Sequence, residues 1–289
     1  MGRTQGKRPR DDAESEASDI RMERSDDEDA SDIDVDFEFM SLNDDDYHGV
    51  SLILKNLLGG EYNGASMSEA IVEQQNIGTT VKTGEDSAIC CLGTILNPRQ
   101  YQSFEGVQQL KTFILSNAQK HAPEKCLTLL KLLLESTSSA VVPGLVVKER
   151  LVNLPLQLSP GLHKVLLDDI AWSLSPEAEC PADEIDYYRF THLVFLSYFL
   201  VDPHQTGNDG RLTSQGKVAE RKKRKQVAEA DRIYMHGEDE TFLESAEASC
   251  SWRVDDHEDG KTKYHKYRLV YVMSMEDYKS AVERLLKAV

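Results

Sequence analysis

The sequence has no apolar run long enough to cross a lipid bilayer. Its longest apolar run, FTHLVFLSYFLV at 190–201, has about twelve residues, whereas a membrane-spanning helix needs about 20. The sequence also shows no signal peptide, no glycine-rich phosphate loop followed by Lys-Ser or Lys-Thr, and no G-x-S-x-G nucleophile elbow. We therefore expect a cytosolic or nuclear protein that is neither a phosphate-loop enzyme nor a serine hydrolase of the elbow type.

Cysteine is scarce and follows no motif. The five cysteines form an odd set without a C-x-x-C pair, and none lies near a histidine in a recognisable nucleophile motif. The adjacent Cys90 and Cys91 lie in an apolar run, where a strand would place their thiols on opposite faces. We expect reduced, partly buried thiols and no disulfide framework.

Patterns that would hold a metal are also weak. The run DDHED at 255–259 could bind one, but such a run between two strands is a solvated hairpin turn about four times in five. A calcium loop starting at Asp202 fails because its twelfth position is Thr213, where a carboxylate belongs. Asp168 and Asp169 are adjacent, so a helix would splay them about 100° apart. No metal and no cofactor are expected.

Charge is unevenly distributed along the chain. Residues 1–46 hold seventeen Asp and Glu against six Lys and Arg, a formal charge of −11 out of the chain's −17. A segment with so much charge and so few apolar residues cannot bury enough surface to fold. We expect residues 1–35 to be a disordered acidic tail and residues 36–289 to form one folded domain.

The patterns after the tail predict alternating strands and helices. Period-two alternation or continuous apolar runs predict strands at 36–42, 77–84, 87–96, 140–155, 187–201, 249–254 and 267–275. Apolar residues at helical spacing predict helices at 47–60, 66–75, 104–121, 124–136, 161–174, 239–248 and 275–289. Pro143–Gly144 suggests a bulge or bend, and 187–201 is expected to be the buried central strand. The fold class is a mixed α/β (α+β) domain whose mixed central sheet is flanked by helices.

Two basic runs stand out in this acidic chain. The long polar segment 203–230 is expected to be a disordered loop inside the domain. The runs that could act as nuclear-import signals consist of Lys7, Arg8, Arg10, Arg221, Lys222, Lys223, Arg224 and Lys225. A run of this kind is about as often only a solvated loop or helix face.

The acidic tail could attract a basic client through long-range electrostatic steering. The residues that would do so are Asp26, Asp27, Glu28, Asp29, Asp32, Asp34 and Asp36. Ser25 and Ser31 have acidic residues three positions on, the context of acid-directed kinases, and each phosphate would add roughly −1.5 to −2 charges. The alternative is a solubilising appendage whose serines only reflect low complexity.

Four segments of the sequence resemble segments of the BCCIP family, most of all its fungal branch, and they occur in the same order as in that family. They are FEFMSLNDDDYHGVSLILKNLL, IVEQQNIGTTVK, GLVVKERLVNLP and YRLVYVMSMEDY, with IGTTVK and GLVVKERLVNLP the most specific. The resemblance implies a nuclear protein that shuttles to the cytoplasm and uses the import and export machinery. It implies a dedicated chaperone for a basic large-subunit ribosomal protein, universal L-fourteen, with a link to nuclear export of other proteins. Animal members bind cell-cycle and recombination proteins.

The resemblance also implies a fold similar to the GNAT acetyltransferases, without a working acetyl-coenzyme A site. Such enzymes hold the pyrophosphate on backbone N–H groups of a Q/R-x-x-G-x-G/A turn between a strand and a helix. The segment QNIGTT at 75–80 has one glycine and leads into a strand. In VNLPLQLSPGLHK, Pro155 and Pro160 lack N–H donors, and only Gly161 allows close approach. We therefore expect the fold without the enzyme.

Three function classes follow. The first is a non-enzymatic chaperone and transport adaptor for basic nuclear proteins, expected to be a monomer; a nuclear scaffold for cell-cycle or recombination proteins is a related alternative. The second is a residual acyltransferase. The third is a nucleic-acid binder that uses Arg221–Lys225, which the chain's overall negative charge and the lack of interleaved aromatic and basic residues disfavour.

Overall fold

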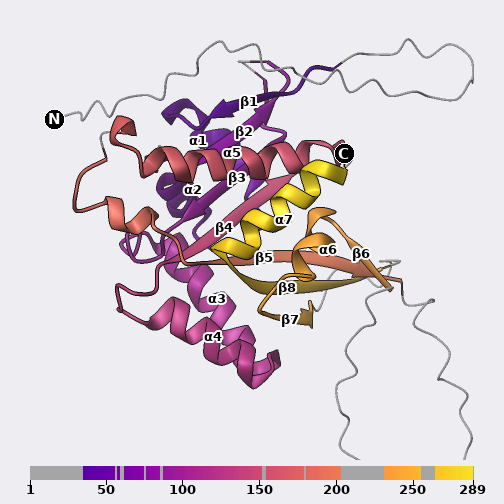
Figure 1. Cartoon of the computed structure of the whole chain (residues 1–289). Helices are drawn as coiled ribbons and strands as arrows, with labels where there is room; N and C mark the ends of the chain where they lie inside the picture. The colour runs from indigo at the N-terminus through magenta and orange to yellow at the C-terminus, as the bar shows by residue number, and fades with distance from the viewer. Residues whose placement is uncertain are drawn as a thin grey trace, which may run out of the picture.

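The computed structural model describes residues 35–55, 57–58, 62–74, 76–84, 87–151, 154–178, 180–202, 231–254 and 264–288. Their strands form one eight-stranded sheet (Figure 1). The strands are β1 (Glu38–Ser41), β2 (Gly78–Lys82), β3 (Cys91–Leu96), β4 (Pro143–Arg150), β5 (His192–Val201), β6 (Arg232–Tyr234), β7 (Ala248–Arg253) and β8 (His265–Ser274).

The sheet is mixed, as the sequence predicts. Its order is β1-β2-β3-β4-β5-β8-β7, and β6 pairs with the end of β5. Only the β4–β5 pair is parallel among these strands, and the other pairs are antiparallel. The parallel pair therefore lies near the middle of the sheet, with an antiparallel group of strands on each side.

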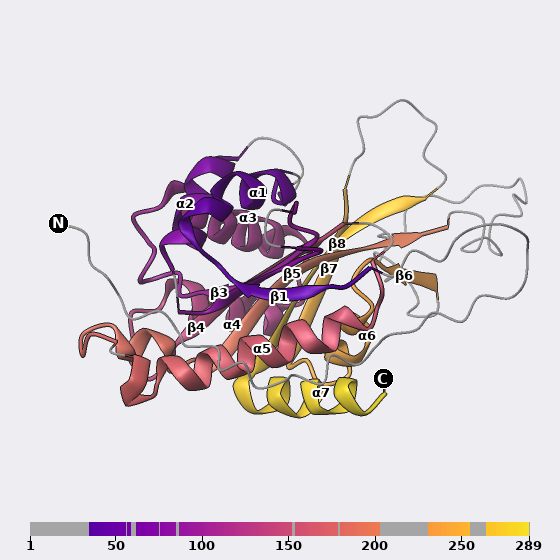
Figure 2. The ribbon, with the colours of Figure 1, turned by 90° about the horizontal axis from the view of Figure 1, so that it is seen from above.

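Helices cover both faces of the sheet (Figure 2). One face carries α1 (Tyr47–Ile53), α2 (Gly64–Glu73), α3 (Glu105–His121) and α4 (Glu124–Glu135). The other carries α5 (Leu158–Ser173), α6 (Glu238–Leu243) and α7 (Met275–Ala288). Three short 3-10 helices complete the described elements: η1 (Asp44–Asp46), η2 (Pro176–Ala178) and η3 (Ile185–Tyr188).

Alternating side chains of the central strands build the two cores. On β5, Val194 and Leu196 pack under α1–α4, whereas Leu193 and Phe195 pack under α5–α7. The same alternation holds along β8. Because both faces of these strands are buried, they read as continuous apolar runs in the sequence. The predicted fold class, a mixed sheet flanked by helices, is confirmed at this level.

Some predicted boundaries are wrong for physical reasons. Pro143 is the first residue of β4, and the register on both sides is continuous, so it causes no bulge. A strand can begin with proline because its missing N–H is least needed there. The predicted strand 187–201 starts only at His192, because residues 185–188 form η3.

Two other elements differ from the prediction. Helix α1 ends at Ile53, although the buried apolar residues continue with Leu54 and Leu57. These two residues lie in a turn, so their apolar spacing reflects burial in the core and does not indicate a helix. Strand β6 was not predicted, because three partly exposed residues carry no periodicity.

Several other predictions can be compared with the described residues. Cys90 is half-buried and precedes β3, Cys91 is buried as the first residue of β3, and the five cysteines are free thiols. Asp168 is exposed whereas Asp169 is buried and accepts a hydrogen bond from Gly78 N at 3.2 Å, so they form no pair. The tail through residue 34, the loop 203–230 and the DDHED run lie outside the described residues.

Candidate functional site

The two parallel strands β4 and β5 diverge toward their carboxyl ends. They pair only from Pro143–His192 to Val146–Phe195. Beyond this point β4 continues to Arg150 and β5 to Val201, and the end of β5 pairs with β6 instead. In α/β sheets, openings at the carboxyl ends of strands are the usual place for a ligand. This gap is therefore the first place to look for an active site.

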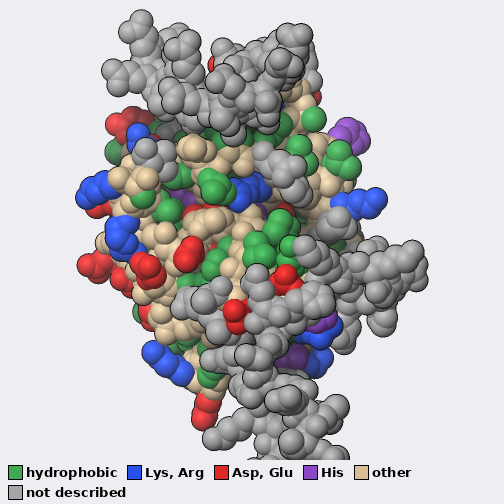
Figure 3. Space-filling view, turned by 90° about the vertical axis from the view of Figure 1, so that its right-hand side faces the viewer, with side chains coloured by type: hydrophobic (Ala, Val, Ile, Leu, Met, Phe, Trp, Pro, Cys, Tyr) green, Lys and Arg blue, Asp and Glu red, His purple; other side chains and the backbone are tan. Residues whose placement is uncertain are grey.

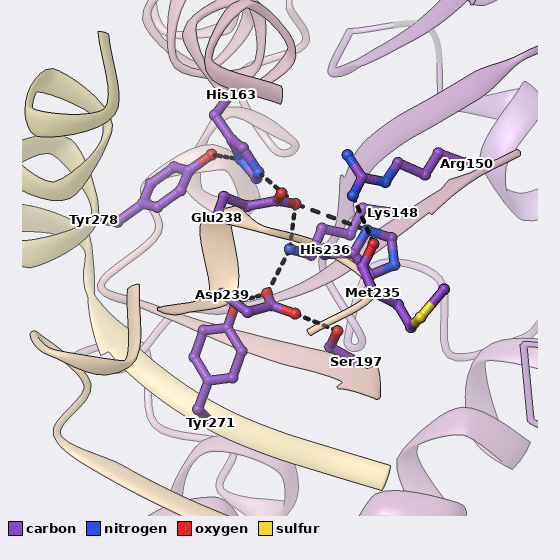
Figure 4. Close-up of polar contacts among 10 residues, drawn as sticks. All are labelled: Lys148, Arg150, His163, Ser197, Met235, His236, Glu238, Asp239, Tyr271 and Tyr278. Carbon is purple, nitrogen blue, oxygen red and sulfur yellow. Dashed lines mark hydrogen bonds and ion pairs between the residues drawn. The ribbon is translucent and has the colours of Figure 1, made fainter. Parts of the chain in front are cut away.

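The chain's own segment Met235–Asp239 fills the gap (Figure 4). Arg150 on β4 donates a hydrogen bond to the carbonyl oxygen of Met235 at 2.6 Å. Lys148, also on β4, places its Nζ atom 2.6 Å from Glu238 Oε1 and 2.6 Å from Asp239 Oδ1. The segment is thus tied to β4 by hydrogen bonds at both of its ends.

Asp239 also binds the opposite side of the gap. Its Oδ2 accepts a short hydrogen bond from Ser197 on β5, and its Oδ1 accepts one from Tyr271 on β8 at 2.7 Å. With Lys148, these residues give the Asp239 carboxylate three donors, which replace the water that it loses on burial. Asp239 therefore joins the two diverging strands through its side chain.

Histidines close the cluster on the α5 side. His163 Nδ1 lies 2.8 Å from the Tyr278 hydroxyl, and its Nε2 lies 3.5 Å from Glu238 Oε1. His236 Nδ1 lies 3.7 Å from the same Glu238 oxygen. Burial lowers the pKa of His163, and burial with the nearby Lys148 lowers the pKa of His236 to about 4. Both imidazoles are therefore neutral at pH 7.

The charges of the cluster are fixed by pairing. Burial opposes ionisation of Lys148 and Glu238, but attraction to nearby groups outweighs it. For Lys148 these groups are Glu238 and Asp239, and for Glu238 they are Lys148 and His163. The pKa of Lys148 is raised, and that of Glu238 lies well below its usual range. Lys148 is only 2% exposed and Asp239 0%. Lys148 and Glu238 are therefore held charged and paired, and neither is poised to exchange a proton near pH 7.

Little free space remains beside the cluster. A cavity of about 10 Å³, enough for one water molecule, is lined by Cys91, Ser159, His236 and Glu238 among others. Ser159 Oγ and Glu238 Oε2 lack hydrogen-bond partners among the described residues, which suits an internal water. Burial raises the pKa of Cys91 to about 12, so its thiol is not a nucleophile.

The outer side of the filled gap is also covered. A Cβ atom added to Gly237 would lie 3.3 Å from Leu156 Cδ2, so Leu156 packs directly over the segment that fills the gap. Figure 3 views the molecule from the side on which β6 and α6 lie in Figure 1. On this face, hydrophobic side chains show in small groups among acidic and basic ones.

The described part of the passage from β4 to α5 leaves little room at its glycine. A Cβ atom added to Gly161 would lie 2.9 Å from the Phe39 ring of β1, so the open space at this glycine is used by a neighbouring strand. The backbone N–H groups of Leu158 and Ser159 bond to Pro155 and Leu156 carbonyls within the same turn. Two of the donors that the chain retains there are therefore already used.

Almost all of the sequence-predicted site residues lie outside the part of the chain that the structure describes, so their roles stay predictions. The two basic runs, Ser25, Ser31 and the acidic residues up to Asp34 lie outside the described residues, and Asp36 is exposed just before β1. In the described part of the chain, no group of three or more His, Cys, Asp or Glu side chains is placed to hold a metal ion. No described helix is both long and apolar enough to cross a membrane.

A family model of BCCIP matches residues 32–242. The chain belongs to the BCCIP family. It is 28% identical over 268 residues to Protein bcp1 of Schizosaccharomyces pombe, covering 88% of this chain and 90% of that protein. It is 31% identical over 262 residues to Protein BCCIP homolog of Arabidopsis thaliana, covering 87% of this chain and 73% of that protein.

The fold of this BCCIP-family chain is also that of a solved relative. The crystal structure of BCP1 from Saccharomyces cerevisiae matches it with a TM-score of 0.58 at 18% identity, covering 88% of each chain. At this identity the likeness shows the fold alone. The region that matches the BCCIP family model includes β4, β5 and the segment that fills the gap between them.

The buried cluster of this BCCIP-family chain was not predicted from the sequence. Lys148 directly follows the apolar run Leu145–Val147 in β4, which is a weak signal of an inward charge that needs a partner. Glu238 and Asp239 resemble ordinary acids in the first turn of a helix. Their ion pairs join residues 90 and 91 positions apart, and no local pattern links them.

Proposed function

We propose that this BCCIP-family protein is a non-enzymatic nuclear chaperone and adaptor for a basic ribosomal protein of the large subunit, universal L-fourteen. In this role it supports ribosome biogenesis and the nuclear export of proteins. It shuttles between nucleus and cytoplasm with the import and export machinery, and the basic runs Lys7–Arg10 and Arg221–Lys225 serve as its import signals. It acts as a monomer.

The observation that carries the proposal is the filled gap between β4 and β5. The place where this kind of sheet would accept a substrate holds Lys148, Asp239 and Glu238 in a paired cluster, with a cavity of about 10 Å³ beside it. An acyl thioester does not fit a space for one water molecule. This supports binding, not catalysis, as the work of the molecule.

The likeness to the GNAT acetyltransferase fold is part of the proposal. The passage from β4 to α5, which that likeness assigns to the cofactor pyrophosphate, has Pro155 and Pro160 in place of two donors and Phe39 against Gly161. These features support a retained fold without its cofactor site. Calorimetric titration with acetyl-coenzyme A tests the acyltransferase alternative, and we expect no heat of binding.

The charge of the chain supports a basic client. The formal charge is −17, of which −11 belongs to residues 1–46. Ribosomal proteins are strongly basic, so an acidic arm would raise their encounter rate and shield them from nucleic acid. Phosphorylation of Ser25 and Ser31 would strengthen the attraction. The alternative that the basic run binds nucleic acid is tested by a salt titration against DNA.

The direct test is co-expression with universal L-fourteen from the same organism. We expect the client to stay soluble and to co-elute with the full chain at moderate salt. A chain lacking residues 1–35 shows whether the acidic tail or the folded domain carries the affinity. Loss of client solubility with both forms would contradict the chaperone proposal.

A further inference from the structure

An open groove of about 900 Å³ lies on the α1–α2 side of the sheet, which we call the acidic groove. Four segments form it: the η1–α1 corner, α2, the β3–α3 connection and η3. Its volume is near the upper end of the range for ligand pockets, so it suits a short stretch of chain. Asp44, Glu69, Glu73 and Glu184 line it, and its lining includes no Lys, Arg or His among the described residues.

The walls of the groove are held by specific contacts. The Asn97 amide donates to the Tyr187 carbonyl at 2.9 Å, and Gln100 donates to the Tyr188 hydroxyl at 3.2 Å. These bonds fix the β3–α3 connection against η3, although the two segments are about ninety residues apart in sequence. The groove is therefore a feature of the folded domain and not of a loose loop.

Close helix packing sets the second wall. A Cβ atom added to Gly106 at the start of α3 would lie 2.5 Å from the backbone nitrogen of Met67 in α2. Glycine at this position lets the two helices approach until Gly106 N donates to Ser66 Oγ at 3.2 Å. This contact places Glu69 and Glu73 of α2 beside the residues that precede α3.

The four carboxylates have no ion-pair partner among the described residues of the domain. Asp44, Glu69 and Glu73 are exposed and Glu184 is half-buried. None of them forms an ion pair with a described residue, whereas the buried Asp46 nearby lies 2.6 Å from Lys82 Nζ. Four unpaired like charges around one concave surface repel one another, and a cationic ligand would relieve that repulsion.

The floor of the groove is aromatic and offers an acceptor. The rings of Tyr101 and Phe104 are in contact, with centroids 6.1 Å apart. Tyr101 is 7% exposed and Phe104 is half-buried, and the parts of these rings that line the groove can contact a Lys or Arg side chain. Gln100 also lines the groove, and its Oε1 atom, which is shielded from solvent, has no hydrogen-bond partner among the described residues.

We propose that the acidic groove is the docking site for an extended segment of the client that carries lysines and arginines. The inference rests on the proposed function and names the surface of the folded domain that performs it. Carboxylates pair with the cationic heads, and Tyr101 and Phe104 pack against their aliphatic stems. A phosphate-bearing ligand such as nucleic acid would be repelled by the same four carboxylates.

The test compares two charge-matched variants of the full chain. The groove variant is Glu73→Gln with Glu184→Gln, and the control is Glu124→Gln with Glu135→Gln on the exposed surface of α4. Each removes two negative charges while keeping the side-chain shape. Calorimetric titration with universal L-fourteen at moderate salt should show affinity weakened about tenfold in the groove variant and within about twofold of wild type in the control.

The outcomes separate the two proposals. Wild-type affinity in the groove variant would overturn the docking site and leave the chaperone proposal standing. Equal weakening in both variants would also overturn it, because the effect would then be net charge alone. Failure of the wild-type chain to bind the client would overturn the proposed function and the docking site together. A second groove variant, Asp44→Asn with Glu69→Gln, repeats the measurement independently with the other two carboxylates of the groove.

Discussion

The Nζ atom of Lys148 in β4 lies 2.6 Å from Oδ1 of Asp239 at the start of α6, 91 residues later in the chain. This ion pair closes the gap between the two parallel strands, and Glu238 reinforces it at the same distance. It converts the most probable ligand-binding position of the sheet into part of the core. Under the proposed function, binding of the client therefore falls to the surface of the molecule.

The buried cluster should be essential for stability. Lys148→Met would leave two buried carboxylates without a counter-charge, and such losses cost about 3–5 kcal/mol. We expect the free energy of unfolding in urea to fall by about that amount. Lys279→Met, on an exposed position of α7, is the control and should change stability by less than about 0.5 kcal/mol. Near-equal stability of the two variants would show that the cluster is not held as described.

His236 should make the protein sensitive to acid. Its pKa is about 4 in the folded state because of burial, against an ordinary value of 6.5. The unfolded state therefore binds more protons below pH 6.5, so stability is full above that pH and falls as pH drops toward 4. Between pH 7 and pH 5, the unfolding free energy of wild type should fall by about 2 kcal/mol more than that of His236→Gln. Parallel pH profiles of the two proteins would refute the lowered pKa.

Glu149 should act in the opposite direction. Burial raises its pKa to about 7, and Arg268 and Lys266 only partly offset that effect. Because the folded state holds its proton more tightly, the stability that Glu149 contributes is present below pH 4.5 and is lost as pH rises through 7. Between pH 5 and pH 8, the unfolding free energy of Glu149→Gln should rise by about 2 kcal/mol relative to that of wild type. The measurement is urea unfolding at each pH. A constant difference across that range would contradict the prediction.

The packing of α2 on α3 should depend on one glycine. Gly106→Ala would put a methyl group 2.5 Å from the Met67 nitrogen, and backbone cannot yield as a flexible side chain does. We expect a loss of about 1–3 kcal/mol in unfolding free energy. Gly64→Ala, whose nearest contact would be 3.6 Å from the Tyr62 ring, is the control and should be neutral or stabilising. Client affinity should fall with Gly106→Ala, since the groove wall moves.

Long periodic elements could be predicted from the sequence, because burial imposes their pattern. Helix α3, helix α7 and strand β8 lie close to where apolar spacing places them. Strand β6 could not be predicted, since its pairing with β5 depends on tertiary position and not on its own composition. The BCCIP membership was also evident from short segments of the sequence.

The site was not predictable in the same way. Lys148 pairs with Glu238 and Asp239 across β5 and β6 in the sequence, and acids in a helix's first turn ordinarily face solvent. The acidic groove likewise joins Glu73 of α2 to Glu184 of a segment more than a hundred residues away. What the sequence does predict is the sign of the charge.

The most direct test of the central claim, a binding protein for a basic client, is a calorimetric titration of the purified full chain with universal L-fourteen at two salt concentrations. Attraction between opposite charges predicts a saturable complex that weakens about tenfold or more between low and moderate salt. Absence of binding at low salt would contradict the claim. Affinity independent of salt would contradict the electrostatic account of it.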